Sequence, residues 1–198
     1  MQQNKGILRG KLKSGWSYDY ERDGEVFYKS TLLVDRLSGV KDEVPLIASA
    51  KHVDNTCLVS EEITLEGSFR SRNLVVNGKS TLQLYFFVDY IGNTIPESTN
   101  LLHLEGYICK EPIHRLTPLN REIADLLIAV NRNTNRSDYL PCIAWGRNAS
   151  WVKTLKLGDK VVIEGRIQSR KFTKQGDLEP NTRTAYEISI SSISSVQV

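Results

Sequence analysis

Apolar and polar residues alternate along much of this chain, with the period of two that is typical of half-buried strands. The segments 6–13 (GILRGKLK) and 62–72 (EITLEGSFRSR) show this clearly, and 44–50 (VPLIASA) is a short apolar run. The pattern predicts strands at 6–13, 30–37, 44–50, 62–72, 81–90, 103–110, 125–132, 140–146, 160–170 and 184–196. It predicts one helix, at 148–155 (NASWVKTL), with Asn148 as the N-cap.

The chain repeats itself at a distance of 96 positions. The matched residues are Leu8 and Leu104, Gly10 and Gly106, Arg36 and Arg132, Pro45 and Pro141, and Ile47 and Ile143. After two inserted residues, Glu66-Gly67 matches Glu164-Gly165, and Ser71-Arg72 matches Ser169-Arg170. Such extended self-similarity indicates two copies of one unit. We expect domains at 1–96 and 99–198, joined by the polar stretch 92–100 (GNTIPESTN).

Each copy carries five predicted strands, and the second places its helix between the third strand and the fourth. This order is typical of the OB-fold, a small closed β-barrel. The sequence therefore predicts an all-β protein with one short helix, built as two tandem five-stranded OB-fold barrels. In the first copy, 51–60 (KHVDNTCLVS) is too broken for a full helix.

Composition narrows the class of protein. Charged residues interrupt the apolar runs, and the first ten residues hold no apolar core of signal-peptide length, so we expect a cytoplasmic protein without a membrane span. The three cysteines form no CxxC motif, and the three histidines are scattered. We therefore expect no metal site, no cofactor and no enzyme activity. The matches to the N-glycosylation sequon carry no meaning in such a protein.

The second copy resembles the bacterial single-stranded DNA-binding protein (SSB) family over nearly all of 100–196. The segments that carry the resemblance are LEGYICKEP, LLIAVNR, CIAWGRNASWV and LKLGDKVVIEGRIQSRKF, in that order. The resemblance implies binding of single-stranded DNA without sequence preference, by a basic groove with aromatic rings on which bases stack. It also implies an assembly of four OB domains. Since this chain carries two, we expect a homodimer, with the first strand of each copy as a candidate pairing edge. The alternative is a monomer whose two copies mimic one dimer internally.

Candidate binding residues follow from strand alternation and from the resemblance. Tyr139 and Trp145 lie on one face of the predicted strand 140–146 and its approach, opposite Leu140, Cys142 and Ala144. The family places stacking aromatics at these two positions and at the position of Phe172. The candidate phosphate contacts are Arg132, Arg147, Arg170, Lys171 and Lys174, of which Arg147 and Lys174 are chosen for charge and location. Trp145 as a cover of the barrel end remains an alternative.

The first copy has lost the stacking positions. Glu43, Ser49 and Leu74 stand where the second copy has Tyr139, Trp145 and Phe172. Residues 1–100 hold 12 Lys and Arg against 13 Asp and Glu, a net charge of −1, whereas residues 101–198 hold 14 against 10, a net charge of +4. We therefore expect the second copy to bind DNA and the first to act as a scaffold or protein contact.

An aromatic stretch in the first copy is a possible second contact patch. It is GWSYDYERDGEVFYKS, with Trp16, Tyr18, Tyr20, Phe27 and Tyr28 around a predicted RDGE turn. Ordinary cross-strand packing, a protein contact and a second DNA patch are all open for it.

The end of the chain suggests an accessory protein. SSB-family proteins usually end in an acidic tip that recruits other proteins, whereas this sequence ends in SSISSVQV. We expect single-stranded DNA binding and protection in replication, recombination or repair, as an accessory or mobile-element SSB. The alternative is an OB-fold protein-interaction scaffold, such as a primosome-like helper, with weak or no DNA binding.

Overall fold

Strands account for most of the computed structural model, which describes residues 3–53, 59, 61–76, 78–96, 99–132, 136–173 and 182–196. The first copy contains β1 (Asn4–Leu12), β2 (Ser17–Arg22), β3 (Glu25–Asp35), β4 (Lys41–Ser49), β5 (Glu62–Val76) and β6 (Lys79–Gly92). The second contains β7 (Asn100–Ile108), β8 (Ile113–Leu116), β9 (Glu122–Asn131), β10 (Ser137–Trp145), α1 (Arg147–Val152), β11 (Lys160–Thr173) and β12 (Thr182–Ser195).

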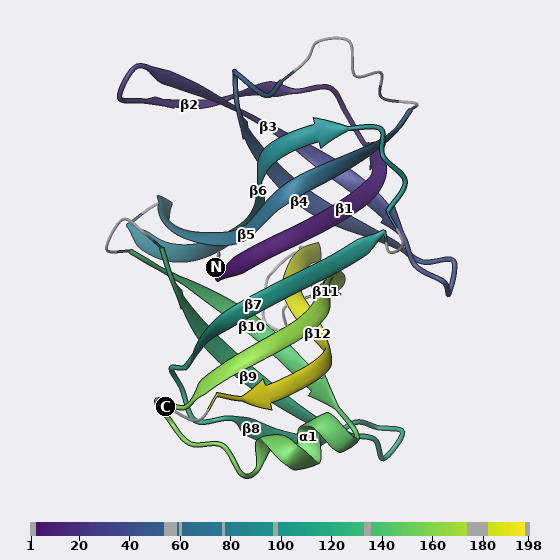
Figure 1. The fold of residues 1–198 in the computed structure, drawn as a ribbon, viewed down its shortest axis with the longest axis vertical. Helices are drawn as coiled ribbons and strands as arrows, with labels where there is room; N and C mark the ends of the chain where they lie inside the picture. Colours follow the sequence, from purple (N-terminus) through teal and green to yellow (C-terminus); the bar gives the residue numbers. More distant parts are fainter. Residues whose placement is uncertain are drawn as a thin grey trace.

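Each copy closes into a five-stranded barrel (Figure 1). The first barrel runs β1-β3-β4-β6-β5 and returns to β1, and the second runs β7-β9-β10-β12-β11 and returns to β7. The pairs β4–β6 and β10–β12 are parallel, and the other pairs are antiparallel. This confirms the predicted all-β class with two tandem OB-folds. The second strand of each barrel also pairs with an additional hairpin strand, β3 with β2 and β9 with β8. The alternation predicted neither β2 nor β8.

The glycine of each repeated Glu-Gly pair lies at a β-bulge, after Glu66 in β5 and after Glu164 in β11. A Cβ atom at Gly67 would lie 2.0 Å from the Phe87 carbonyl oxygen, and one at Gly165 would lie 2.5 Å from that of Ser189. Both positions therefore require glycine because the neighbouring backbone approaches too closely for a side chain.

The two barrels are joined edge to edge by their first strands. β1 and β7 pair antiparallel, from Asn4 opposite Leu104 to Leu8 opposite Asn100, and lie side by side between the barrels (Figure 1). Our expectation that these strands offer pairing edges to another chain is therefore wrong along this stretch. Each strand satisfies its outer backbone groups within the same chain, because the duplication supplies the partner strand.

A buried Arg–Asp–Ser cluster crosses the interface between the barrels. Arg132 and Asp138 of the second copy form a two-point ion pair, with Arg132 Nε 2.8 Å from Asp138 Oδ2. The Ser71 amide of the first copy donates to Asp138 Oδ1 at 2.6 Å, and Arg132 Nη2 donates to the Ser71 carbonyl oxygen at 2.9 Å. The Tyr139 amide donates to the Ser71 hydroxyl oxygen at 2.8 Å.

The same cluster recurs with the two copies exchanged. Arg36 and Asp42 of the first copy form the ion pair, and the Ser169 amide of the second donates to Asp42 at 2.6 Å. Arg36 Nη2 donates to the Ser169 carbonyl oxygen at 3.1 Å. Both aspartates are fully buried. The repeated serines therefore form part of the contact between the barrels. An approximate two-fold axis relates the two clusters, and with them the two barrels.

Local details differ from the sequence prediction around the helix. α1 begins at Arg147 after Gly146, which has a φ of 52° and no side-chain cap, so Asn148 is not the N-cap. Asn148 instead donates from Nδ2 to the Ser191 carbonyl oxygen at 3.0 Å. The predicted RDGE turn is confirmed, with positive φ at Asp23 and Gly24 between β2 and β3. No helix among the described residues is long and apolar enough to cross a membrane.

Candidate nucleic-acid interface

Three aromatic rings of the second barrel are exposed where the sequence placed them. Tyr139 and Trp145 on β10 expose 46% and 39% of their surface, and Phe172 on β11 exposes 38%. The intervening Leu140, Cys142 and Ala144 are buried. Tyr139 and Trp145 lie six residues apart on one strand, or roughly 20 Å at about 3.3 Å per residue. The rings therefore occupy both ends of β10 and the neighbouring hairpin.

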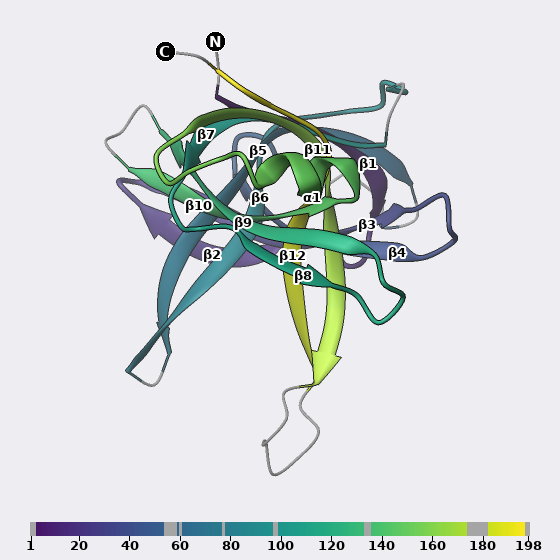
Figure 2. The same ribbon diagram turned by 90° about the horizontal axis from the view of Figure 1, so that it is seen from below.

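Phe172 lies on a long arm. It pairs with Arg183 in the β11–β12 hairpin, close to the edge of the described residues. Figure 2 shows this hairpin and the corresponding β5–β6 hairpin extending from one side of the molecule. Such paired arms suit contact with an extended ligand that passes across both barrels.

The predicted cations differ in their freedom to meet a ligand. Arg147 and Arg170 are exposed and make no ion pair with the described residues. Lys171 reaches the first barrel, with Nζ 3.3 Å from Glu43 Oε1, and Lys13 also contacts that carboxylate at 2.7 Å. The hydrogen bond from Lys13 and then that from Lys171 lower the pKa of Glu43. Lys174 lies outside the described residues.

Arg132 is held by the interface between the barrels. Its hydrogen bonds to Asp138 raise the pKa of the Arg132 guanidinium above its ordinary value. With its Nε and one Nη group engaged by Asp138 and the Ser71 carbonyl oxygen, Arg132 is fixed in place. It nevertheless lines a cavity next to the first barrel.

The aromatic stretch of the first copy separates into packed and exposed members. Tyr20 stacks on Phe27 with ring centroids 4.7 Å apart, and Phe27 packs with Ile47 and Tyr85 in a small buried cluster. Trp16 packs against the main core, Tyr28 is half-buried, and Tyr18 is 59% exposed. Cross-strand packing thus accounts for the positions of Tyr20 and Phe27.

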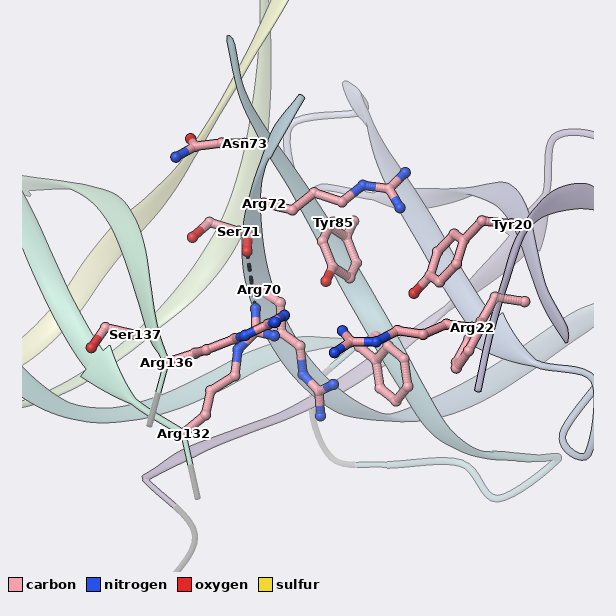
Figure 3. A pocket seen from close by; sticks show the side chains of 12 residues that line it. Tyr20, Arg22, Arg70, Ser71, Arg72, Asn73, Tyr85, Arg132, Arg136 and Ser137 are labelled. Carbon is pink, nitrogen blue, oxygen red and sulfur yellow. Dashed lines mark hydrogen bonds between the residues drawn. The ribbon is translucent and has the colours of Figure 1, made fainter. Parts of the chain in front are cut away.

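Beside these rings lies a cavity of about 580 Å³ that the sequence did not reveal (Figure 3). Its lining residues are Tyr20, Arg22, Phe27, Arg70, Ser71, Arg72, Asn73, Tyr85, Phe87, Arg132, Arg136 and Ser137. Five of them are arginines, and none of these described lining residues is acidic. We call this space the arginine cavity. The nearest sequence signal was the run Arg70-Ser71-Arg72, which the repeat comparison treated as scaffold.

Two arginines from β5 organise the cavity. The Arg72 guanidinium lies 5.2 Å from the centroid of the Tyr20 ring and 5.4 Å from that of Tyr85, and it pairs with Asp19 at 2.8 Å. The Arg70 guanidinium lies 3.8 Å from the centroid of the Phe87 ring. Burial is the main cause that lowers the pKa of Arg70. Burial is also the main cause that raises the pKa of Tyr20.

Comparison with known proteins identifies relatives of the second copy. The model of the single-strand binding protein family matches residues 99–196. The single-stranded DNA-binding protein of Mycoplasma pneumoniae is 32% identical over 94 residues, which are 46% of this chain and 56% of that protein. Single-stranded DNA-binding protein A of Bacillus subtilis is 36% identical over 83 residues, which are 38% of this chain and 48% of that protein. The chain thus spans about half the length of these curated relatives.

A solved structure matches the whole fold. The wild-type single-stranded DNA binding protein from Thermus aquaticus superposes with a TM-score of 0.79, and the match covers 98% of this chain and 93% of that one. The sequence identity is 19%, so this likeness concerns the fold, a tandem pair of OB barrels.

Proposed function

The chain belongs, through residues 99–196, to the single-strand binding protein family, and from this premise we propose that it binds and protects single-stranded DNA without sequence preference. Proteins of this family are non-enzymatic and bind single-stranded DNA. In the proposed complex, bases stack on Tyr139, Trp145 and Phe172 of the second barrel. Arg147 and Arg170 contact phosphates, and Lys171 joins them when it leaves Glu43.

One observation carries this proposal. The rings of Tyr139, Trp145 and Phe172 are exposed, whereas Leu140, Cys142 and Ala144, which lie between the first two rings on β10, are buried. Large apolar side chains are normally exposed only singly, and an exposed aromatic group that crosses a strand and a hairpin is typical of a binding surface. Every base has a π-face, so a ring binds bases of any sequence. The exposed cations Arg147 and Arg170 each lie two residues along the chain from a ring, Arg147 from Trp145 and Arg170 from Phe172. Stacking and charge are therefore available together.

The proposal is tested by titrating the full chain with labelled oligo-dT at several salt concentrations. Stacking contributes about 1–3 kcal/mol per base, so Trp145→Ala and Phe172→Ala should each weaken binding roughly ten-fold or more. Tryptophan fluorescence should be quenched by oligo-dT, and affinity should fall steeply with salt because phosphate contacts release counterions. Leu157→Ala, an exposed apolar position in the loop before β11, is the control and should bind normally.

Two results would refute the proposal. Equal affinity for duplex and single strands would exclude the stacking mode. Absence of oligo-dT binding would favour the alternative function, a protein-interaction scaffold that retains the fold.

We further propose that the chain assembles as a homodimer with four OB barrels. The edges of β1 and β7 are already paired, so a second chain would meet the outer face of these strands, where Ile7, Leu101 and Tyr107 are at least partly exposed. Closed two-fold symmetry is the commonest arrangement for such a contact. Sedimentation equilibrium at micromolar concentration should give twice the 22.4 kDa chain mass. A clean monomer mass would exclude the dimer.

The proposed setting is DNA replication, recombination or repair in the cytoplasm, in an accessory or mobile-element role. Complementation distinguishes this role from a principal one. An accessory protein should fail to replace the host's main single-stranded DNA-binding protein in a depletion strain, whereas full rescue would contradict the accessory role.

A further inference from the structure

The arginine cavity, lined by residues of both copies, has a composition that the fold does not require. The repeat provides a comparison for Arg70, because the β5–β6 hairpin of the first copy corresponds to the β11–β12 hairpin of the second. The cross-strand pair Arg70 and Tyr85 corresponds to Gln168 and Glu187. There, Gln168 Nε2 donates to Glu187 Oε1 at 2.6 Å, so an acid stands at the matching place. Arg70 is therefore a property of this surface alone, whereas Arg72 and Arg132 match Arg170 and Arg36 of the other copy.

Three of the five arginines have guanidinium groups available to a ligand. Arg70 donates from Nε to the Ser68 hydroxyl oxygen at 2.7 Å, and its Nη groups have no hydrogen-bond acceptor among the described residues. Arg136 makes no side-chain ion pair within the described part of the chain. Among the described residues, Arg22 forms an ion pair only with Asp23, at 3.3 Å and largely exposed to solvent, and such pairs contribute little.

The other two arginines are fixed by acids outside the cavity lining, Arg72 by Asp19 and Arg132 by Asp138. Figure 3 shows Arg22 reaching in from one side, Arg132 and Arg136 from the other, and Arg70 between them. Asp23, Asp19 and Asp138 pair with three of these arginines, and Asp89 acts on Arg70, so part of the charge is offset. The remaining gathering of like charges is unfavourable unless an anion or solvent screens it, because neighbouring cations repel one another. The cavity thus favours a ligand with several negative charges.

The rings of the cavity leave little room for base stacking. Tyr20 stacks on Phe27 and has the Arg72 guanidinium over its ring, and Phe87 has that of Arg70 over its ring. The cavity volume, about 580 Å³, lies within the range of roughly 300–1,000 Å³ that is typical of ligand sites. The cavity therefore offers a ligand positive charge and little free aromatic surface.

We propose that the arginine cavity binds the phosphate groups of the DNA backbone without stacking the bases. This inference rests on the proposed function and adds a separate site: the exposed rings of the second barrel hold bases, and the cavity, which the first barrel forms with Arg132 and Arg136 of the second copy, holds backbone. Arg22, Arg70 and Arg136 supply the phosphate contacts. Arg72 and Arg132 add positive charge to the cavity, and their ion pairs with Asp19 and Asp138 fix the positions of these lining side chains.

The test uses the full chain and two labelled strands of equal length, oligo-dT and an abasic strand with the same sugar-phosphate backbone. The variants are the double substitution Arg22→Gln with Arg136→Gln, and the single substitution Arg70→Gln. Arg121→Gln, at an exposed arginine before β9, is the charge-matched control. Trp145→Ala is the comparison for stacking. Melting temperatures verify that each variant is folded.

Wild-type protein should bind the abasic strand measurably, and the cavity variants should weaken binding of both strands by similar factors, roughly ten-fold for each charge-assisted hydrogen bond that is lost. The slope of log affinity against log salt should become shallower by about 0.7 for each lost phosphate contact. Trp145→Ala should weaken oligo-dT binding and leave abasic binding nearly unchanged. Arg121→Gln should behave as wild type.

The results that would contradict these expectations distinguish a failure of the proposed function from a failure of the cavity assignment. If no oligo-dT binds, the proposed function is wrong. If oligo-dT binds and folded cavity variants match the control on both strands, only the cavity assignment is wrong. Tripolyphosphate, titrated by calorimetry, distinguishes the source of the phosphate. Binding of tripolyphosphate that the cavity variants abolish, with no change on either strand, would assign the cavity to a free polyphosphate and overturn the backbone assignment.

Discussion

Replacement of Asp138 by alanine tests the contact that holds the two barrels together. Asp138 is fully buried and accepts hydrogen bonds from Arg132 and from the Ser71 amide of the other barrel. Asp138→Ala leaves a largely buried guanidinium and a buried amide without their acceptor. Loss of one partner of a buried ion pair costs about 3–5 kcal/mol. Since the Arg132 side chain is 24% exposed, we expect the lower end, about 3 kcal/mol.

That cost should be visible in thermal unfolding. For a chain of this size, each kcal/mol corresponds to about 2–4 °C, so Asp138→Ala should lower the melting temperature by roughly 6–12 °C. Asp42→Ala, in the exchanged copy of the cluster, should have a similar effect. The two clusters share no residue, so the double variant should show nearly the sum of the two costs.

The chain supplies a matched control for this measurement. Arg115 and Asp125 form the same two-point ion pair, at 2.6 Å and 3.1 Å, but with side chains 49% and 35% exposed. Asp125→Ala should therefore cost less than about 1 kcal/mol. If urea unfolding gives Asp138→Ala the same small cost as Asp125→Ala, the buried clusters do not hold the barrels together and the reasoning is wrong.

Two further predictions follow from close contacts. Gly165→Ala should destabilise the protein by about 1–3 kcal/mol or more in urea unfolding, because its Cβ would meet the Ser189 carbonyl oxygen, whereas Gly15→Ala, with open space around it, should be neutral. Glu43→Gln should strengthen oligo-dT binding and steepen its salt slope by up to about 0.7, since Lys171 is released for a phosphate. The pKa of Glu43 is lowered in the folded protein, so its ion pairs persist at neutral pH and weaken only as the pH falls below its ordinary pKa of 4.5. An unchanged affinity for Glu43→Gln at pH 7 would contradict this.

The alternation of residues, the internal repeat and the order of the predicted elements together predicted the two barrels. Leu140, Cys142 and Ala144 are buried and Tyr139 and Trp145 are exposed because each strand of a closed barrel has one inner and one outer face, although Ile143 on the outer face is buried as well. The repeat likewise located the glycines of the two bulges. These features depend on neighbours along the chain or on the nearest paired strand, so local sequence carries them.

Features that depend on contacts between the copies were not predictable in the same way. Arg132 matched a phosphate-binding position, yet its guanidinium is engaged by Asp138 and the carbonyl oxygen of Ser71, 61 residues away. The arginine cavity combines residues of β2, β3, β5 and β6 with Arg132, Arg136 and Ser137 of the second copy, and the sequence did not predict that this segment of the second copy lies beside the first barrel. The cap of α1 was missed because Gly146 adopts a positive φ and takes the place of a side-chain cap.

The comparison of the two copies distinguishes structural residues from residues with separate roles. Arg36, Asp42 and Ser169 repeat the contacts of Arg132, Asp138 and Ser71, so both copies retained what an approximately symmetric interface requires. The outer surfaces have diverged in opposite directions. The second copy has exposed rings where the first has Glu43 and Ser49, and the first has Arg70 and Tyr85 where the second has Gln168 and Glu187. A duplicated scaffold with a shared interface permits this divergence, because a change on one outer surface leaves the other barrel intact.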